Sequence, residues 1–201
     1  MSRLVMFGQS IDAPPAAVAT WALAELVGPL EIVGQIHWVH SFSLPRTSPD
    51  EVGRALQAVI AHLRENEEIT DLPRFAKAIR LVRACLESVL ESSAALDAWE
   101  ASHVPQDKRS AHYKATESQG PMRPPWLHQK GFQDQLGSLS AAFSRYLELL
   151  PPIVTMIQQM APEVAASYNL SRIASQIPVY KDLLTLGYEE TIRREATKPS
   201  A

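Results

Sequence analysis

A regular hydrophobic repeat occupies the middle of the chain and limits the folds that it can adopt. Between residues 71 and 101, apolar side chains recur at steps of three and four, and Leu90 and Trp99 widen the stripe. Ser93 takes the one position of the repeat that should be apolar. This spacing predicts a long helix at about 71–101, in the core of a bundle rather than in a bare coiled coil. The residues of the repeat are Leu72, Phe75, Ile79, Val82, Leu86, Val89 and Leu96.

Helical spacing also marks the segments on either side. A capping signal formed by Ser48 and Glu51 starts a helix that runs to about Asn66. Apolar residues between 127 and 150 share one helical face, and Pro151-Pro152 are expected to end that helix and to start another. The chain is therefore predicted to be all-α, a bundle of six or seven helices. Further helices are expected at 16–27, 171–176 and 179–186.

The segment from Gln35 to Leu44 allows two structures. Its even positions are mostly apolar and its odd positions mostly polar, a period of two that suits a strand. Ile32, Ile36 and Val39 also lie about one helical turn apart, so residues 32–44 fit a helix equally well. The strand alternative would add a small N-terminal β element, with residues 4–7 as its pairing partner.

The chain divides into two predicted helical halves joined by a polar segment. Residues 1–102 contain the long patterned helix, and residues 126–201 form a C-terminal half that shares the same core. The intervening residues 103–125 are polar, contain Gly120 and four prolines, and show no hydrophobic period. They are expected to form a long flexible loop or linker.

Composition excludes several classes of protein. The net charge of −3 and the apolar content of 46% exclude a disordered chain and a protein that coats nucleic acid through bulk positive charge. The single cysteine, Cys85, excludes an internal disulfide. The uncharged stretches 13–24 and 32–45 are shorter than the about 20 residues that cross a membrane, and the N-terminus does not resemble a secretory signal. We therefore expect a cytoplasmic or nuclear protein without a transmembrane segment.

The sequence contains no motif that is typical of an enzyme or a metal site. The patterns HExxH, GxSxG, GxGxxG and the P-loop are absent. His37 and His40 would share a face only if their segment is helical, and no third ligand can be named. Cys85 has no recognisable base to activate it as a nucleophile. We accordingly predict no catalytic residue, no cofactor and no metal ion.

The charges of the long predicted helix run against its dipole, because a helix N-terminus favours acidic side chains. The helix before it ends with an acidic cluster. In an antiparallel hairpin, the acidic end would lie beside the basic start and each would neutralise the other. The alternative is a site for an anionic partner: an acidic protein segment, a phosphate or a lipid head group. The basic residues are Arg74, Lys77, Arg80 and Arg83, and the acidic residues are Glu65, Glu67 and Glu68.

These features favour a non-catalytic protein that binds a protein partner or itself through helical surfaces, as a scaffold, an adaptor or a homo-oligomer. An alternative is a helical bundle that binds an apolar ligand or a lipid, because residues 13–45 are nearly uncharged and Met156 and Met160 lie in an apolar stripe. A third is an enzyme of unrecognised mechanism, which would require a concave pocket with convergent polar groups. Nucleic acid is a disfavoured partner.

Overall fold

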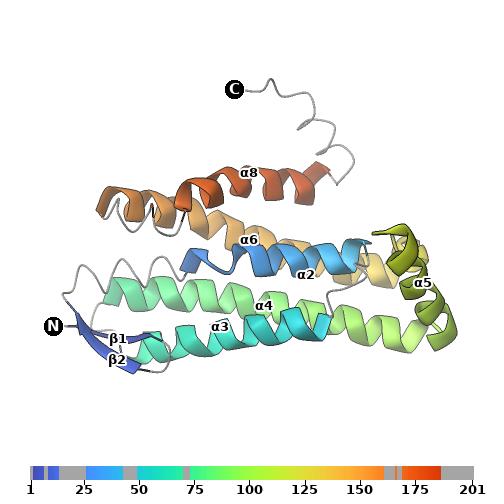
Figure 1. Ribbon diagram of the computed structural model, residues 1–201, viewed down its shortest axis with the longest axis horizontal. Helices are drawn as coiled ribbons and strands as arrows, with labels where there is room; N and C mark the ends of the chain where they lie inside the picture. The colour runs from blue at the N-terminus through green and yellow to red at the C-terminus, as the bar shows by residue number, and fades with distance from the viewer. Residues whose placement is uncertain are drawn as a thin grey trace, which may run out of the picture.

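The helices of this protein pack lengthwise into a bundle. The computed structural model describes residues 2–6, 9–13, 26–42, 49–69, 73–160, 166 and 169–186, and over these residues the predicted all-α fold is confirmed. Figure 1 shows α3 and α4 side by side, α2 and α6 next to them, and α8 against α6. The helices are α2 (Leu30–Phe42), α3 (Pro49–Ile69), α4 (Pro73–His103), α5 (Gln106–Gln119), α6 (Lys130–Met160) and α8 (Leu170–Leu186), with a 3-10 turn, η1 (Pro125–His128), before α6.

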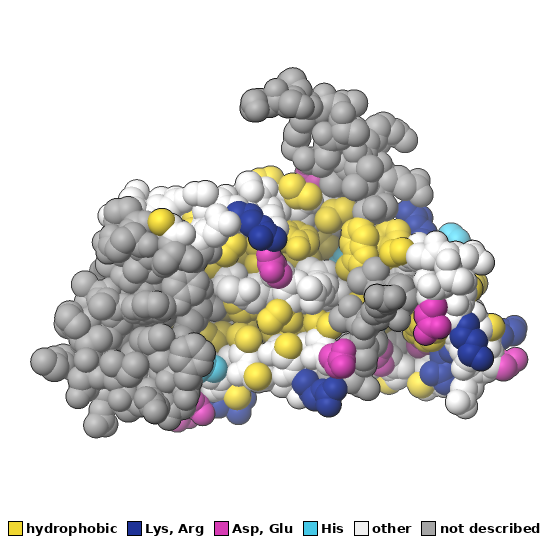
Figure 2. All heavy atoms as spheres, viewed as in Figure 1, with side chains coloured by type: hydrophobic (Ala, Val, Ile, Leu, Met, Phe, Trp, Pro, Cys, Tyr) yellow, Lys and Arg dark blue, Asp and Glu magenta, His cyan; other side chains and the backbone are white. Residues whose placement is uncertain are grey.

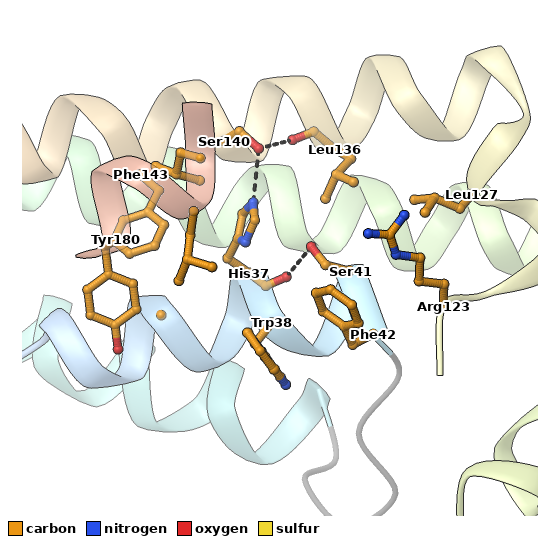
Figure 3. Close-up of a pocket in the computed structure, with 13 residues that line it drawn as sticks. His37, Trp38, Ser41, Phe42, Arg123, Leu127, Leu136, Ser140, Phe143 and Tyr180 are labelled. Atoms are coloured by element: carbon orange, nitrogen blue, oxygen red, sulfur yellow. Dashed lines mark hydrogen bonds between the residues drawn. The ribbon is translucent and has the colours of Figure 1, made fainter. Parts of the chain in front are cut away.

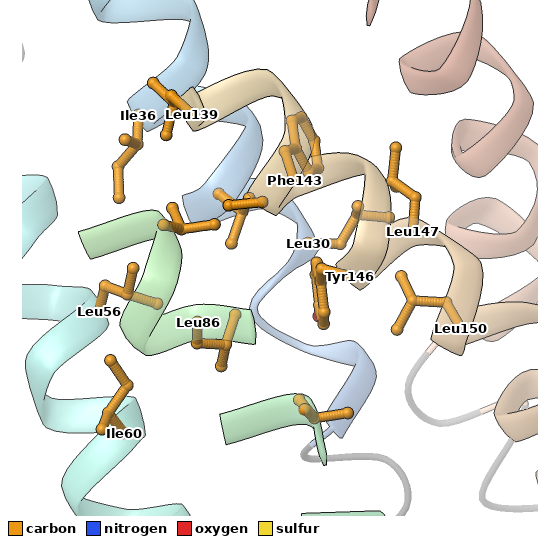
Figure 4. Close-up of a cluster of buried hydrophobic side chains, with 14 of the residues drawn as sticks. Leu30, Ile36, Leu56, Ile60, Leu86, Leu139, Phe143, Tyr146, Leu147 and Leu150 are labelled. Atoms are coloured by element: carbon orange, nitrogen blue, oxygen red, sulfur yellow. The ribbon is translucent and has the colours of Figure 1, made fainter. Parts of the chain in front are cut away.

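The hydrophobic repeat forms the central helix of the bundle, α4. Its apolar positions from residue 79 onward are buried, and α4 packs against both α3 and α6. Figure 4 shows Leu86 between Leu56 of α3 and Tyr146 of α6. Burial of one such leucine contributes roughly 1.5–3 kcal/mol before the entropy of ordering the chain is subtracted. The buried residues of the repeat are Ile79, Val82, Leu86, Val89 and Leu96.

A buried tyrosine joins α6 to the residues that precede α2. Tyr146 is completely buried, and its hydroxyl donates a hydrogen bond to the backbone oxygen of Leu26 over 2.9 Å. Burial raises the pKa of Tyr146 well above its usual range, so the hydroxyl stays a donor. Phe143, one turn earlier, is also buried. These two aromatic side chains set the position of α2 against α6.

The strand alternative for residues 32–44 is wrong over Leu30–Phe42, which form α2. Val33, Ile36 and Val39 are buried at helical spacing, and this burial outweighs the alternating pattern of the same segment. A small β element does occur at the N-terminus, but its strands pair with each other. β1 (Ser2–Met6) and β2 (Gln9–Ala13) form an antiparallel hairpin in which Leu4 lies opposite Ile11.

The loop predicted at 103–125 is wrong over Gln106–Gln119, which form α5. This helix lacks a hydrophobic period because polar side chains anchor it. His112 and Thr116 are buried, and the Tyr113 hydroxyl donates to the Glu100 carboxylate of α4 over 2.8 Å. The ring of His112 also meets Trp126 edge-on, with ring centroids 5.1 Å apart. A search for apolar spacing cannot detect a helix that is held in this way.

Two predicted helix ends at prolines are also wrong. Pro151 and Pro152 lie inside α6, and Pro178 lies inside α8, so that residues 171–176 and 179–186 belong to one helix. All three prolines are exposed. In α6 the buried neighbours Leu150 and Ile153 hold the helix to the core on both sides, which offsets the missing backbone hydrogen bonds. The predicted helix at 16–27 lies almost entirely outside the described residues.

Candidate functional site

An apolar cavity lies between α2, α6 and α8. Its volume is about 260 Å³, slightly below the roughly 300–1,000 Å³ of typical small-molecule pockets. Figure 3 shows side chains from the three helices converging on it, with Tyr180 at one end and Arg123 at the other. The cavity is lined by Gly34, His37, Trp38, Ser41, Phe42, Arg123, Leu127, Leu136, Ser140, Phe143, Tyr180, Leu183 and Leu184.

Helical periodicity brings these residues together. In α2, Gly34, His37, Trp38 and Ser41 recur at steps of three, one and three, so they share one face. The lining residues of α6 and α8 follow the same spacing. A shallower groove of about 360 Å³ between α2 and α8 shares Gly34, Trp38, Tyr180 and Leu183 with the cavity. The cavity therefore opens along the line where α2 and α8 meet, and Figure 2 shows hydrophobic side chains along this line.

His37 provides a neutral polar group inside the cavity. The Ser140 hydroxyl donates to the backbone oxygen of Leu136 over 2.9 Å, so the Nε2–H of His37 donates to Ser140 Oγ over 3.0 Å. Burial lowers the pKa of His37 to about 4. The imidazole is therefore uncharged at neutral pH. Ser41 is likewise engaged, because its hydroxyl donates to the backbone oxygen of His37.

Arg123 brings a positive charge to one end of the cavity. Its guanidinium lies over the Phe42 ring, 5.6 Å from the centroid. The backbone N–H of Met122 donates to the carbonyl of Phe42 over 2.9 Å, which fixes this segment to the C-terminal end of α2. Among the lining residues that the structure describes, Arg123 is the only one that is charged at neutral pH.

Gly34 permits the close approach of α8 to α2. A Cβ atom at this position would lie 2.6 Å from two atoms of the Tyr180 side chain. Figure 3 shows the Tyr180 ring at this end of the cavity. Burial raises the pKa of Tyr180, so its hydroxyl remains protonated and can serve as a neutral polar group.

We expect Gly34→Ala to lower the free energy of unfolding by about 1–3 kcal/mol, because the Tyr180 ring must move away from the new methyl group. Gly137→Ala in α6 is the matched control, since no atom lies within 4 Å of its Cβ position. That control should instead gain up to about 1 kcal/mol, the usual preference of a helix for alanine over glycine. Urea unfolding of both variants measures the two changes. Equal stabilisation by both would show that Tyr180 does not occupy this position.

A second polar cluster links α2 to α4. His40 Nε2 lies 2.8 Å from Ser93 Oγ, and His40 Nδ1 lies 4.0 Å from a carboxylate oxygen of Asp97. Burial, together with the neighbouring His37, lowers the pKa of His40 to about 4. The order of residues resembles a Ser-His-Asp triad, but the distance to Asp97 is too long for a hydrogen bond and a base this weak activates serine poorly.

The position of Ser93 also argues against nucleophilic catalysis. Ser93 lies within the regular helix α4, whose backbone N–H groups already bond within the helix and cannot form an oxyanion hole. Ser93 is only 7% exposed. We therefore assign His40 and Ser93 a structural role: they satisfy each other where α2 crosses the central helix. This explains the polar residue in the hydrophobic repeat.

The four basic residues of the predicted anionic-partner site are partly engaged within the protein. Glu67 of α3 accepts from Arg80 over 2.7 Å and from Arg83 over 3.0 Å, and Arg83 also contacts Glu87 over 2.7 Å. These hydrogen bonds lower the pKa of the Glu67 carboxyl. The hairpin interpretation is thus confirmed for this pair of arginines. Lys77 is exposed on α4, and the side chain of Arg74 lies outside the described residues.

Other candidate chemistry is limited in the described part of the chain. Cys85 is half-buried, and burial raises the pKa of its thiol, which disfavours the reactive thiolate. No group of three or more His, Cys, Asp or Glu side chains among the described residues could hold a metal ion. No described helix has both the length and the hydropathy of a membrane span.

Comparison with known proteins gives no further assignment. The chain matches no protein-family model, no curated protein and no solved structure.

Proposed function

We propose that this protein binds a small, largely apolar ligand in the cavity between α2, α6 and α8. The observation that carries the proposal is the lining itself: aliphatic and aromatic side chains from three helices surround a few polar groups. This combination is characteristic of small-molecule sites, in which apolar walls supply affinity and isolated polar groups supply orientation. The volume of about 260 Å³ suits a single alkyl chain or a small ring system.

Neutral polar groups in the cavity support this class of ligand. His37 and Ser140 satisfy each other, and Ser41 bonds the backbone, so an apolar ligand would leave none of these contacts unpaired. Trp38 and Phe143 add aromatic surface. A hydrocarbon bound here would bury apolar area at roughly 25 cal/mol per Å² without displacing a protein hydrogen bond.

Protein–protein interaction or assembly, which the sequence favours first, stays a prediction. Large apolar patches mark such surfaces. Among the described residues, Leu81 and Tyr113 are the large hydrophobic side chains that are exposed, at 47% and 38%. They lie on different helices, α4 and α5, and neither belongs to the cavity. The described surface therefore favours the ligand-binding proposal.

Leu136→Trp is expected to weaken the binding of the neutral fluorescent probe N-phenyl-1-naphthylamine at least about 10-fold, because the larger side chain fills the cavity. Leu81→Trp is the matched control, since the same exchange takes place at an exposed position of α4. Fluorescence titration measures probe affinity, and circular dichroism confirms that each variant is folded.

Leu184→Phe, a smaller change on the opposite wall, tests the same proposal if Leu136→Trp destabilises the bundle. Weaker probe binding in either cavity variant, with unchanged binding in Leu81→Trp, supports the cavity as the binding site. Failure of the wild-type protein to bind the probe or 1-decanol would overturn the proposed function. Equal binding by all variants would place the site elsewhere and would also overturn it.

A further inference from the structure

We infer that the ligand carries a neutral hydroxyl group, as an alkanol or a phenol does, and that this hydroxyl donates a hydrogen bond to His37 Nδ1. The inference rests on the proposed function and adds the chemical class of the ligand and the residue that selects it. A chain of hydrogen bonds carries it, because these bonds use the donors near His37 and leave one ring nitrogen as an acceptor.

Two hydrogen bonds fix which nitrogen of His37 carries the proton. Ser140 donates its hydroxyl hydrogen to the backbone oxygen of Leu136 over 2.9 Å. Ser140 Oγ can therefore only accept from His37 Nε2, which lies 3.0 Å away, so the proton of the neutral ring is on Nε2. Burial lowers the pKa of His37 to about 4, and the ring holds no second proton at neutral pH. Nδ1 is consequently a lone-pair acceptor.

His37 Nδ1 has no hydrogen-bond partner among the described residues. The described side-chain nitrogens that are both unpartnered and closed off belong to His112 and Trp126, so Nδ1 is open to the cavity that His37 lines. The ring also packs against Phe143, with ring centroids 6.0 Å apart. Its contacts with Ser140 and Phe143 hold Nδ1 in place, which reduces the entropy lost when a ligand binds.

The other polar groups near His37 add no donor at this point of the cavity. The Ser41 hydroxyl donates to the backbone oxygen of His37 over 2.8 Å, so its oxygen can only accept from a ligand. Figure 3 shows the Trp38 indole nitrogen directed away from the His37 ring. It also shows Arg123 at one end of the cavity, where this exposed side chain lies over the Phe42 ring. The hydrogen at Nδ1 must therefore come from the ligand.

This arrangement distinguishes ligands by the hydrogen that they supply. A hydroxyl group satisfies Nδ1, whereas a hydrocarbon leaves it unpaired at a cost in free energy. An ether or a ketone of the same size would place an oxygen lone pair against the nitrogen lone pair, and a carboxylate would add a full negative charge to this repulsion. An ammonium group would find no aspartate or glutamate in the described lining to compensate its charge. A neutral alcohol or phenol avoids all of these costs.

The test compares two ligands that differ in a single donor. The molecules 1-decanol and 1-methoxynonane have the same number of non-hydrogen atoms, but only the alcohol has an O–H group. Both are titrated at neutral pH against the full-length protein loaded with N-phenyl-1-naphthylamine. We expect the wild-type protein to bind the alcohol about 3–10-fold more tightly than the ether, the net effect of one hydrogen bond. Equal displacement of the probe by both ligands would overturn the inference and leave the proposed function intact.

His37→Phe assigns the preference to the ring nitrogen, because it keeps an aromatic ring and removes Nδ1. The ratio of alcohol affinity to ether affinity should fall to about 1. His103→Phe makes the same exchange at an exposed position of α4 outside the cavity, and it should keep the wild-type ratio. A wild-type ratio in folded His37→Phe would show that another group accepts the hydroxyl, and would overturn the inference.

Nitrogen NMR of the wild-type protein gives a readout that does not depend on a variant's folding. In protein labelled with ¹⁵N-histidine, a hydrogen bond to Nδ1 moves its resonance toward that of a protonated nitrogen. Saturation with 1-decanol should produce this shift at His37, and 1-methoxynonane should not. Displacement of the probe by 1-decanol without the shift would overturn the inference.

Discussion

Acidification from pH 7 to pH 4.5 is expected to lower the free energy of unfolding by roughly 3–5 kcal/mol, because α2 buries two neutral histidines. The pKa values of His37 and His40 are about 4 in the folded protein, against 6.5 in the unfolded chain. Between these values the unfolded state binds more protons than the folded state. Stability is therefore complete above pH 6.5 and falls as the pH decreases toward 4.

The surroundings of the two imidazole rings determine how the loss of unfolding free energy is divided between His37 and His40. His40 is only 6% exposed and faces Ser93 and Asp97 of α4, whereas half-buried His37 faces Ser140 of α6 and the cavity. The partly exposed Asp97 carboxylate favours the protonated form of His40, but burial outweighs this attraction. We therefore assign the larger share, about 2–3 kcal/mol, to His40.

One buried carboxyl opposes this trend. Burial raises the pKa of Glu100, so the folded protein takes up this proton before the unfolded chain does, and acidification favours the folded state at this residue. Variants of His40 separate its contribution to the acid sensitivity from the opposing contribution of Glu100. Gln is the appropriate replacement, because its amide nitrogen can take the place of Nε2 beside Ser93 without titrating.

Urea unfolding at several pH values between 4.5 and 7 provides the measurement. His40→Gln should reduce the loss of stability by about 2–3 kcal/mol relative to wild type. His128→Gln, at an exposed position in η1, is the matched control for the chemistry of the exchange. A wild-type free energy of unfolding that stays constant over this range, or a His40→Gln variant as sensitive to acid as wild type, would contradict the burial of these rings as neutral groups.

Most of the fold could be predicted from the sequence, because apolar periodicity carries the information. The helices α3, α4 and the first part of α6 bury the faces that their spacing indicates. Periodicity failed for α5, where Tyr113 bonds Glu100 of α4 and the His112 ring packs against Trp126. It also failed at the prolines of α6 and α8, whose exposed rings do not interrupt packing. The formation of α5 and the continuation of α6 and α8 through their prolines depend on contacts with residues of other helices.

The candidate site could not be predicted because its residues are brought together only by the fold. Gly34, Arg123 and Tyr180 are far apart in the chain, and none belongs to a motif. Arg123 lies in a segment whose polar composition indicated a loop, and the backbone contact of Met122 with Phe42 places it at the cavity. Because the sequence of residues 32–44 fits a strand and a helix equally well, it also did not show that Gly34 and His37 share a face.

Ser93→Leu is expected to lower the free energy of unfolding by roughly 2–5 kcal/mol, although it completes the hydrophobic repeat of α4. Sequence pattern alone predicts the opposite, because position 93 faces the core. In the folded protein, however, Ser93 Oγ lies 2.8 Å from His40 Nε2, and both residues are buried. A leucine would leave that ring nitrogen without a partner and would add volume to a buried contact.

Ser93→Ala separates the two causes, since it removes the hydrogen bond without adding volume. We expect a loss of about 1–3 kcal/mol, against less than about 0.5 kcal/mol for Ser138→Ala, an exposed serine of α6 whose hydroxyl bonds its own helix. The lost hydrogen bond should lower the free energy of unfolding less in His40→Phe than in Ser93→Ala. In His40→Phe the Ser93 hydroxyl can still bond to the backbone carbonyl one turn earlier in α4.

The double variant His40→Phe/Ser93→Ala makes the argument quantitative. If the two side chains stabilise the fold by satisfying each other, replacing both by apolar groups should cost at least about 1 kcal/mol less than the sum of the single changes. Additive costs would instead mean that the two residues act independently. In that case the loss of stability in Ser93→Leu would come from the added side-chain volume and not from an unpaired His40 ring nitrogen.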